Sequence, residues 1–264
     1  MDEQAVARAF RLAHFEKLGS TNDEALARAR AGDPGRLWIV ADEQSGGRGR
    51  LGRTWSSPAG NLYASLLLLD PAPPLHLSEL GFVAGVALAE SVRALVDADP
   101  RLGIKWPNDL LFAEAKLGGI LLESTPLPGG GRACVIGIGV NCRSHPDNTP
   151  YPATALVKIG DAALAEKPIG PEHVFRALSA SLARWLEVWA GGKEFGQIRV
   201  EWLKYAAHIG RTIQIVRPNG RIEGIFKSID AQGRLILTGP QGEKVIEAGD
   251  VFLNAPPSDD SKAM

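Results

Sequence analysis

The segment Ser45-Gly-Gly-Arg-Gly-Arg-Leu-Gly-Arg-Thr-Trp55 lies between two strongly apolar stretches and is the most informative part of the sequence. Its four glycines allow the backbone to approach a ligand closely or to change conformation when one binds. Arg48, Arg50 and Arg53 carry permanently charged, planar guanidinium groups that pair with phosphate or carboxylate. The segment therefore predicts a loop that binds an anionic ligand. From these residues alone, a solvated loop or one that binds nucleic acid through nonspecific charge is an equal alternative.

The overall composition helps to decide between these alternatives. The chain has 264 residues, of which 45% are hydrophobic and 22% are charged, and its formal net charge is −1. This length and apolar content predict a sizeable core in one large domain, or a large domain followed by a small one. A domain that binds nucleic acid is usually basic overall. The arginine-rich loop is therefore a local feature of a balanced protein, which argues against a general nucleic-acid binder.

Three features of the sequence predict a protein of the cytoplasm. The first residues, Met1 to Gln4, lack the basic region and the apolar core of a signal peptide. The apolar runs are expected to fall well short of the roughly 20 residues that a membrane-spanning helix needs. Cys134 and Cys142, the two cysteines of the chain, are expected to be reduced thiols rather than a disulfide or a metal site.

The first hundred residues are expected to alternate between helices and buried strands. Helices are predicted over 4–17, from the Ser20–Glu24 segment to Gly32 and from Ser78 to about Val96, with strands at 37–41 and 61–69. Thr21 and Glu24 have the spacing of a capping box, and Gly32 is suited to end that helix. Ser78 is expected to cap the long helix that follows.

The remainder of the chain changes its pattern at Gly210. Before that point we predict strands at 104–106, 117–123 and 133–140, a loop at 143–152, and helices at 171–190 and 195–206, the first with Trp185 and Trp189 on its apolar side. After it, residues 212–226 alternate with period two around Asn219-Gly220, a strong hairpin signal, and short strands are predicted at 233–237 and 244–246. These strands predict a small β-barrel, and the polar residues 255–264 predict a disordered tail.

The motif Lys105-Trp-Pro-Asn-Asp109 is expected where a strand ends. Pro107 stops strand pairing, so that Asn108 and Asp109 present polar side chains at the strand edge. The carboxylate of Asp109 can coordinate Mg²⁺ through oxygen beside the phosphates of a nucleotide. A simple Asx turn between two strands is the alternative.

Two glycine-containing strands carry further polar residues. Lys116 precedes Gly118-Gly119, which places a cation beside bare backbone, a geometry suited to an activated acyl phosphate. Gly137 and Gly139 weaken packing in a buried strand unless another group approaches the backbone closely. Asn141 follows them and offers a donor and an acceptor that suit the edge of an adenine. A solvated lysine and a β-bulge ending in an asparagine turn are the alternatives.

Taken together, five motifs resemble those of the biotin protein ligases, also called biotin–[acetyl-CoA-carboxylase] ligases, in residue type, order and spacing. They are Ser20-Thr-Asn22, Gln44 with the loop up to Trp55, KWPND at 105–109, KLGGILLE at 116–123 and GIGVN at 137–141. The specific motifs cover about residues 15–141. The family's small C-terminal domain is matched by residues 210–254 through pattern alone.

This resemblance implies an α+β fold in two domains. A class II synthetase-like catalytic domain, with a mixed, largely antiparallel sheet and flanking helices, is expected over residues 1–208. A small SH3-like β-barrel is expected over residues 209–254, ahead of the tail.

The resemblance also implies a two-step reaction with biotin and ATP as substrates and Mg²⁺ as cofactor. The carboxylate of biotin attacks the α-phosphate of ATP, giving biotinyl-5′-AMP and pyrophosphate. A lysine on a biotin carboxyl carrier domain, of acetyl-CoA carboxylase or a related carboxylase, then displaces AMP. The first step brings two anions together and therefore needs fixed positive charge. The reactive anhydride needs protection from water, and the arginine loop suits a lid, since its three arginines are expected to repel one another until an anion arrives.

The family's motifs, matched position by position, imply a role for each candidate residue. The catalytic residues would be Lys116, Arg48, Arg50 and Arg53. The biotin-binding residues would be Ser20, Thr21, Asn22, Gln44, Gly47, Arg48, Gly49, Arg50, Lys116 and Gly118. The ATP-binding residues would be Arg50, Arg53, Trp55, Asn108, Lys116 and Asn141. Asp109 would be the residue that holds the metal ion.

Two other functions stay open at this point. A lipoate–protein ligase would share the fold and the adenylation chemistry, but its acyl chain lacks the ureido group that Ser20, Thr21 and Gln44 would bond. An RNA-binding module would use the arginine loop and the terminal barrel, but the sequence lacks interleaved aromatic residues for base stacking. Because the motifs begin at Ser20, no N-terminal DNA-binding domain is expected. Neither nucleic acid nor a membrane is expected as a partner, and homodimerisation is left open.

Overall fold

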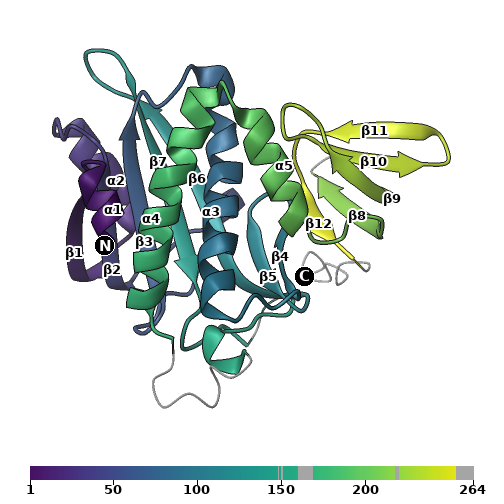
Figure 1. The fold of residues 1–264 in the computed structure, drawn as a ribbon, viewed down its shortest axis with the longest axis horizontal. Coiled ribbons are helices and arrows are strands. Elements are labelled where there is room, and N and C mark those ends of the chain that lie inside the picture. Colours follow the sequence, from purple (N-terminus) through teal and green to yellow (C-terminus); the bar gives the residue numbers. More distant parts are fainter. Residues whose placement is uncertain (148, 150, 160–168, 218–219, 254–264) are drawn as a thin grey trace, which may run out of the picture.

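A seven-stranded sheet and a five-stranded sheet organise the molecule (Figure 1). The structure is a computed structural model, and it describes residues 1–147, 149, 151–159, 169–217 and 220–253. The strand order of the large sheet is β1-β2-β3-β7-β6-β5-β4. β1 runs parallel to β2, and the remaining neighbours are antiparallel. This is the mixed, largely antiparallel sheet that the sequence predicts.

The large sheet and its helices have the following bounds. The strands are β1 (Arg11–Leu18), β2 (Leu37–Gln44), β3 (Leu62–Leu69), β4 (Leu102–Lys105), β5 (Asp109–Phe112), β6 (Ala115–Pro126) and β7 (Arg132–Val140). The α-helices are α1 (Glu3–Ala7), α2 (Thr21–Arg30), α3 (Leu80–Leu95), α4 (Pro171–Trp189) and α5 (Phe195–Tyr205). The short 3₁₀ turns are η1 (Arg50–Gly52), η2 (Pro74–Glu79), η3 (Leu156–Lys158) and η5 (Ala190–Gly192).

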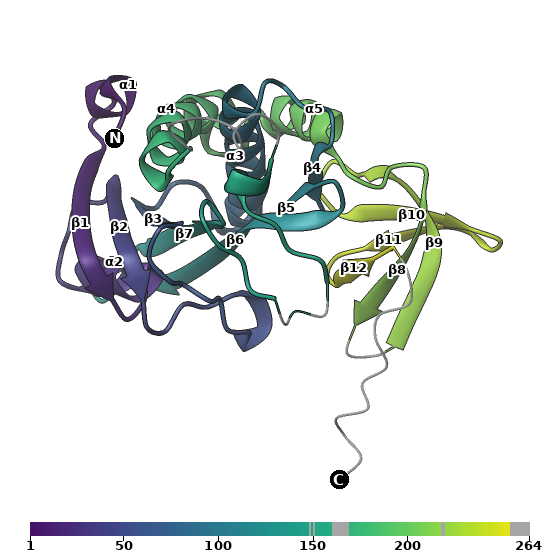
Figure 2. The ribbon, with the colours of Figure 1, turned by 90° about the horizontal axis from the view of Figure 1, so that it is seen from below.

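The helices cover the two faces of the large sheet unequally. Figure 2 shows α3, α4 and α5 together on one side, whereas α2 lies on the other. Side chains alternate between the two faces along a strand. In β7, Ile136 and Ile138 therefore join the main core with α3 and α4, while Val135 packs beneath α2 with Ile39. The part of the α2 face that α2 leaves uncovered is available for a ligand site.

The helix predicted over residues 4–17 is wrong beyond its first turns. α1 covers only Glu3–Ala7, and residues 11–18 form β1, paired in parallel with β2. In β1, Ala13 and Phe15 are partly buried, whereas their neighbours in the sequence are exposed. Pairing with β2 buries the side chains on one face of this alternating segment. The resulting stabilisation outweighs the weak local preference for helix.

Several boundaries also differ from the predictions. Ser20 rather than Thr21 caps α2, because its hydroxyl accepts a hydrogen bond from the N–H of Asp23 at 3.4 Å. Ser78 is not the cap of α3, since it lies inside η2 and α3 begins after Glu79. The strands β5 and β12 are not predicted at all, because four and three residues are too few for a periodic signal. The helices predicted at 171–190 and 195–206 are confirmed by α4 and α5.

One helical segment is longer and more apolar than predicted from the sequence. Residues 74–95, which comprise η2 and α3, form a 22-residue stretch that contains an 18-residue window with a mean hydropathy of 1.3, sufficient in length and composition to cross a membrane. In the structure this segment is a core helix. α3 packs against α4, α5 and the strands of the large sheet, and most of its side chains are buried.

The C-terminal sheet is antiparallel, with the order β11-β10-β9-β8-β12. Its strands are β8 (Thr212–Arg217), β9 (Gly220–Ile229), β10 (Leu235–Gly239), β11 (Gly242–Ile246) and β12 (Asp250–Phe252). The pairing of Arg217 with Gly220 confirms the predicted hairpin, although Asn219 and the tail at 255–264 lie outside the described residues. The indole N–H of Trp106 donates to the carbonyl of Gly233 at 3.0 Å and so ties this sheet to the KWPND motif.

The core of the large sheet makes a direct stability prediction. Leu66 in β3 is fully buried, with 0% of its surface exposed. We expect Leu66→Ala to lower the free energy of unfolding by about 2–5 kcal/mol, measured by urea denaturation. Leu75→Ala is the control, because Leu75 is 81% exposed and should cost no more than about 0.5 kcal/mol. Equal losses in the two variants would contradict this description of the core.

Candidate functional site

The floor of a cavity beside the arginine loop is one row of residues that crosses five strands. Tyr63 in β3 pairs with Gly139 in β7, which pairs with Gly119 in β6. Gly119 pairs with Asp109 in β5, and Asp109 pairs with Lys105 in β4. Cross-strand partners point to the same face of a sheet, so these five residues share the face that carries α2. The two glycines in the middle leave bare backbone between a phenol and a charged pair.

Trp55, at the end of the arginine loop, covers this bare backbone. A Cβ atom on Gly139 would lie 2.7 Å from the indole of Trp55, and one on Gly119 would lie 3.2 Å from it. The two glycines are therefore required by the close approach of the ring. The indole N–H of Trp55 is buried and has no acceptor among the residues that the structure describes. Buried donors are nearly always paired, so this N–H, which faces the backbone of Gly139, is an exception within the site.

A second row of residues, two positions along each strand from the first, carries polar groups. Ser65 in β3 pairs with Gly137 in β7, and a Cβ on Gly137 would collide with Asn22 Oδ1 at 2.3 Å. The Ser65 hydroxyl lies 2.6 Å from Asn22 Oδ1 and 2.7 Å from Thr21 Oγ1. Asn22 Nδ2 donates to Glu123 Oε2 at 2.6 Å. These contacts fix the orientation of the Asn22 amide at the N-terminus of α2.

The same polar row continues to the end of β2. Gln44 Oε1 accepts hydrogen bonds from the N–H of Thr21 at 2.8 Å and from its hydroxyl at 3.0 Å. Gln44 Nε2 donates to Ser57 Oγ at 3.0 Å. Ser20, Thr21 and Asn22 are all buried, and each lines the cavity. This end of the cavity is therefore a preoriented set of hydroxyl and amide groups, suited to a ligand with both donors and acceptors.

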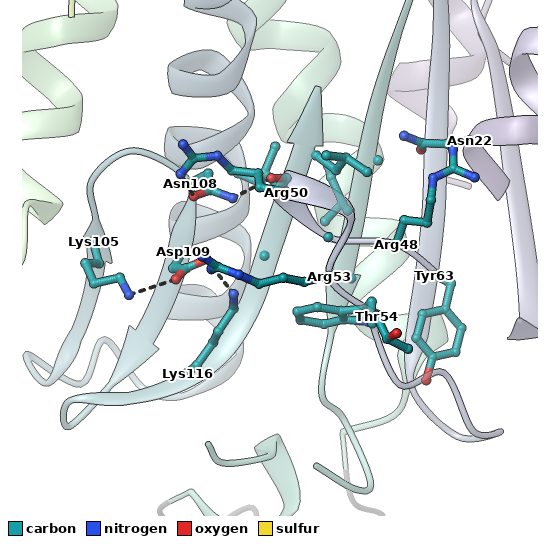
Figure 3. A pocket seen from close by; sticks show the side chains of 18 of the residues that line it. Asn22, Arg48, Arg50, Arg53, Thr54, Tyr63, Lys105, Asn108, Asp109 and Lys116 are labelled. Carbon is teal, nitrogen blue, oxygen red and sulfur yellow. Dashed lines mark hydrogen bonds and ion pairs between the residues drawn. The ribbon is translucent and has the colours of Figure 1, made fainter. Parts of the chain in front are cut away.

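The opposite end of the cavity is cationic (Figure 3). Lys116 Nζ lies 2.6 Å from Asp109 Oδ1, and Lys105 Nζ lies 2.9 Å from Asp109 Oδ2. Burial raises the pKa of Asp109, but the two ammonium groups outweigh burial and hold this pKa below its usual value. The ammonium of Lys116 also lies 5.3 Å from the centroids of the Trp55 and Tyr151 rings. Two aromatic faces and one carboxylate therefore orient this lysine toward the cavity.

Arg48 holds the start of the loop against the polar end. Its guanidinium contacts both oxygens of Asp23, at 2.5 and 2.7 Å, and lies 3.2 Å from Glu123 Oε2. The hydrogen bond to Asp23 is the main reason that the pKa of Arg48 is raised. The same pairing lowers the pKa of Asp23. Glu123 thus links Arg48 to Asn22.

Arg50 and Arg53 extend from the loop toward the C-terminal sheet. Arg53 forms an ion pair with Asp250, the first residue of β12, and this contact is the main reason that its pKa is raised. Arg50 Nη1 lies 3.1 Å from Asn108 Oδ1 and 3.9 Å from Asp250 Oδ1 (Figure 3 labels Arg50 and Asn108). The expectation that the three arginines repel one another until an anion arrives is therefore wrong. Carboxylates of the chain itself compensate them.

The structure brings most of the predicted site residues together. The cavity is lined by Ser20, Thr21, Asn22, Gln44, Arg48, Gly49, Arg50, Arg53, Trp55, Asn108, Asp109 and Lys116. Gly47, Gly118 and Asn141 are not brought to its surface. Gly47 and Gly118 allow close backbone packing, against Ser57 and Gly139 respectively. Asn141 is buried, and its amide donates to the carbonyl of Thr154 at 3.0 Å.

Other residues of the site carry no predicted role. They are Asp23, Ser57, Tyr63, Ser65, Lys105, Glu123, Tyr151, Asp250, Val251 and Phe252. Lys105 begins the KWPND motif and Glu123 ends the KLGGILLE motif. A charged residue at the end of an apolar strand could therefore have indicated both as site residues. Asp250 gives no such signal, because it follows Arg53 by 197 residues.

Comparison with known sequences identifies two family domains. The profile of the Biotin/lipoate A/B protein ligase family matches residues 18–141, and that of the Biotin protein ligase C terminal domain matches residues 208–254. The biotin–[acetyl-CoA-carboxylase] ligase of Paracoccus denitrificans is 39% identical over 237 residues, 90% of this chain and 98% of that protein. The protein of the same name from Mycobacterium tuberculosis is 33% identical, over 89% of this chain and 86% of that protein.

Solved structures share the fold. The biotin protein ligase of Aquifex aeolicus, in complex with biotin and ATP, matches with a TM-score of 0.77 at 26% identity, over 92% of this chain and 98% of that chain. The biotin protein ligase of Leishmania major, in complex with biotinyl-5-AMP, matches with a TM-score of 0.61 at 25% identity, over 90% of this chain and 99% of that chain.

The packing of Asn22 on bare backbone predicts the effect of a methyl group. We expect Gly137→Ala to displace Asn22 and to lower the free energy of unfolding by about 1–3 kcal/mol in urea denaturation, because the new Cβ overpacks a buried contact. Gly239→Ala in β10 is the control, since a Cβ there meets nothing within 4 Å. A Gly137→Ala protein as stable as the control would show that Asn22 does not occupy this position.

Proposed function

The chain belongs to the biotin protein ligase family, and from this premise we propose that it attaches biotin to a lysine of a biotin carboxyl carrier domain of acetyl-CoA carboxylase or a related carboxylase. Its two family domains and its relatives identify it as an ATP-dependent biotin ligase. The observation that carries the proposal is the polarity of one cavity. Hydroxyl and amide groups line one end, with Arg48 beside them, and four further cationic side chains line the other end: Arg50, Arg53, Lys105 and Lys116.

The polar end suits the ureido ring of biotin, which has one carbonyl acceptor and two N–H donors. Thr21 and Ser20 hydroxyls can act as donor or acceptor, and Gln44 and Asn22 hold their orientation through the contacts described above. A lipoyl dithiolane ring offers these groups neither a donor nor an acceptor, so it would lie against them without forming hydrogen bonds. A ureido ring can use their remaining donor and acceptor capacity, which favours biotin over lipoate. The distinguishing measurement is pyrophosphate release with biotin or with lipoate as the acid.

The cationic end suits the first chemical step. The biotin carboxylate attacks the α-phosphorus of ATP, a P–O bond to pyrophosphate breaks, and both reactants are anions. Lys116 and Arg50, held by Asp109 and Asn108, place positive charge where these anions meet. Trp55 lines the same cavity beside Lys116, so its ring can contact the nucleotide.

The second step needs little beyond positioning, because the mixed anhydride is already activated. The neutral amine of the acceptor lysine attacks the acyl carbon, the bond to the AMP oxygen breaks, and AMP leaves as an anion. The cationic side chains that received the nucleotide can also stabilise this leaving phosphate. The loop from Gly46 to Thr54 lies over the cavity and can exclude water from the anhydride.

A magnesium ion fits this site only as a partner of the nucleotide. In the part of the chain that the structure describes, no group of three acidic, histidine or cysteine side chains is arranged to hold a metal. Mg²⁺ commonly binds through one or two carboxylates plus substrate phosphates. Asp109 would hold such an ion, which would neutralise phosphate charge. Both Asp109 oxygens contact ammonium groups, so the phosphates would have to replace Asp109 as the partner of one lysine.

The proposed location is the cytoplasm. Both cysteines are free and buried, which fits a reducing compartment. Burial raises the pKa of the Cys134 thiol to about 11, so this thiol stays protonated at neutral pH.

Lys116 provides the test of the adenylation chemistry. We expect Lys116→Ala to keep the fold and to lower kcat for biotin-dependent pyrophosphate release by about 10²–10³, because one preorganised charge contact is lost. Lys204→Ala is the control, since Lys204 is exposed and pairs only with Glu201 among the described residues. Pyrophosphate release within about threefold of the unmodified protein would remove Lys116 from the catalytic set.

Asp109 provides the test of the metal assignment. We expect Asp109→Asn to raise the Mg²⁺ concentration needed for half-maximal activity, because a neutral amide is a poorer ligand for a hard cation. Mg²⁺ titrations at saturating ATP measure this shift, and Asp99→Asn is the control, because Asp99 pairs with Arg101 and does not line the cavity. An unchanged Mg²⁺ dependence would show that Asp109 serves to orient Lys105 and Lys116 and does not hold the metal ion.

A further inference from the structure

The C-terminal sheet contributes one strand to the cavity. Asp250, Val251 and Phe252 of β12 all line it, beside the arginine loop. β12 is fixed by antiparallel pairing with β8, in which Asp250 lies opposite Val216. The Asp250 carboxylate is therefore held in place by the C-terminal sheet, while the arginines that it meets belong to the loop of the large domain.

Asp250 and Asp109 are the two acidic residues among the described lining residues. Asp109 is compensated by two lysines, whereas Asp250 pairs with Arg53 and lies 3.9 Å from Arg50. The Asp250 side chain is only 19% exposed, compared with 51% for Arg53. The carboxylate is thus the sheltered partner, and the arginine retains an open side toward the solvent and the ligand.

We propose that Asp250 is a positioning residue that occupies, in the ligand-free protein, the place on Arg50 and Arg53 that a nucleotide phosphate takes. This inference rests on the proposed function, in which both arginines bind ATP. Carboxylate and phosphate use the same forked guanidinium donors, so one anion displaces the other. Two anions on one guanidinium would also repel each other.

Two consequences follow from this exchange. First, Asp250 closes the loop against the C-terminal sheet before any ligand binds, because its ion pair joins the two. Second, the pair stabilises only the ligand-free state, so removing the carboxylate strengthens nucleotide binding. A partly exposed ion pair of this kind has an effect of about two- to fivefold on an equilibrium.

If Asp250 supported phosphate binding instead, its removal would change the affinity for ATP in the opposite direction. If Asp250 stayed on Arg53 and oriented it toward the bound phosphate, removal of the carboxylate would weaken the binding of ATP. The direction of the change therefore separates exchange from support.

The experiment follows trypsin cleavage after Arg50 and Arg53 in the 264-residue chain. Asp250→Asn removes the charge with little change in shape, and Asp250→Glu retains it. Glu243→Gln is the matched control, because Glu243 pairs with Lys227 in the same sheet and does not line the cavity. Circular dichroism checks that each variant is folded.

We expect Asp250→Asn to be cleaved faster than the unmodified protein without ligand, and its ATP concentration for half-maximal protection to be two- to fivefold lower. Asp250→Glu and Glu243→Gln should behave like the unmodified protein. Unchanged cleavage without ligand, or a higher ATP midpoint in Asp250→Asn, would overturn the proposal. Cleavage without ligand does not depend on catalysis, so a failure of the proposed function appears separately, as an unmodified protein that releases no pyrophosphate from biotin and ATP.

Discussion

The concentration of positive charge in one cavity is the constraint on which the rest of the site depends. Five cationic side chains line it, and left alone they would repel one another across short distances. The chain supplies carboxylates from four separate elements: Asp23 from α2, Asp109 from β5, Glu123 from β6 and Asp250 from β12. Each ion pair therefore also ties the arginine loop or a strand to another part of the fold. The contacts that compensate the positive charges are therefore also contacts that stabilise the tertiary structure.

The second requirement is open space beside these charges, and strand register provides it. Gly119 and Gly139 lie opposite each other between Tyr63 and Asp109, so that one row of the sheet has no side chains in its middle. Trp55 can lie on that bare backbone only because a Cβ atom is absent from both positions. A shift of one residue in the register would turn these glycines toward the core and would place the side chain of Ile138, now in the main core, on the cavity face.

The sequence predicts the composition of this site better than its geometry. The glycines, arginines and lysines stand in compact motifs, and most of them do meet in one cavity. Register and long-range pairing are not visible in the motifs. β5, which aligns Asp109 with Gly119, is four residues long, and Asp250 stands 197 residues after Arg53. The helix predicted over residues 4–17 is wrong for the same reason, because the strand conformation of β1 depends on pairing with β2.

Internal carboxylates also bear on which ligands the site accepts. A cavity with unpaired cations would bind any phosphate, including free AMP or inorganic phosphate. Here an anion has to compete with Asp109 for Lys116 and with Asp250 for Arg53, which lowers the affinity of every anion. In the function proposed above, biotin and ATP together would regain this loss, since they bring two anionic groups and a ureido ring that Thr21 and its neighbours can bond. Discrimination is a difference of affinities, so a penalty shared by all anions favours the one combination that satisfies both ends of the cavity.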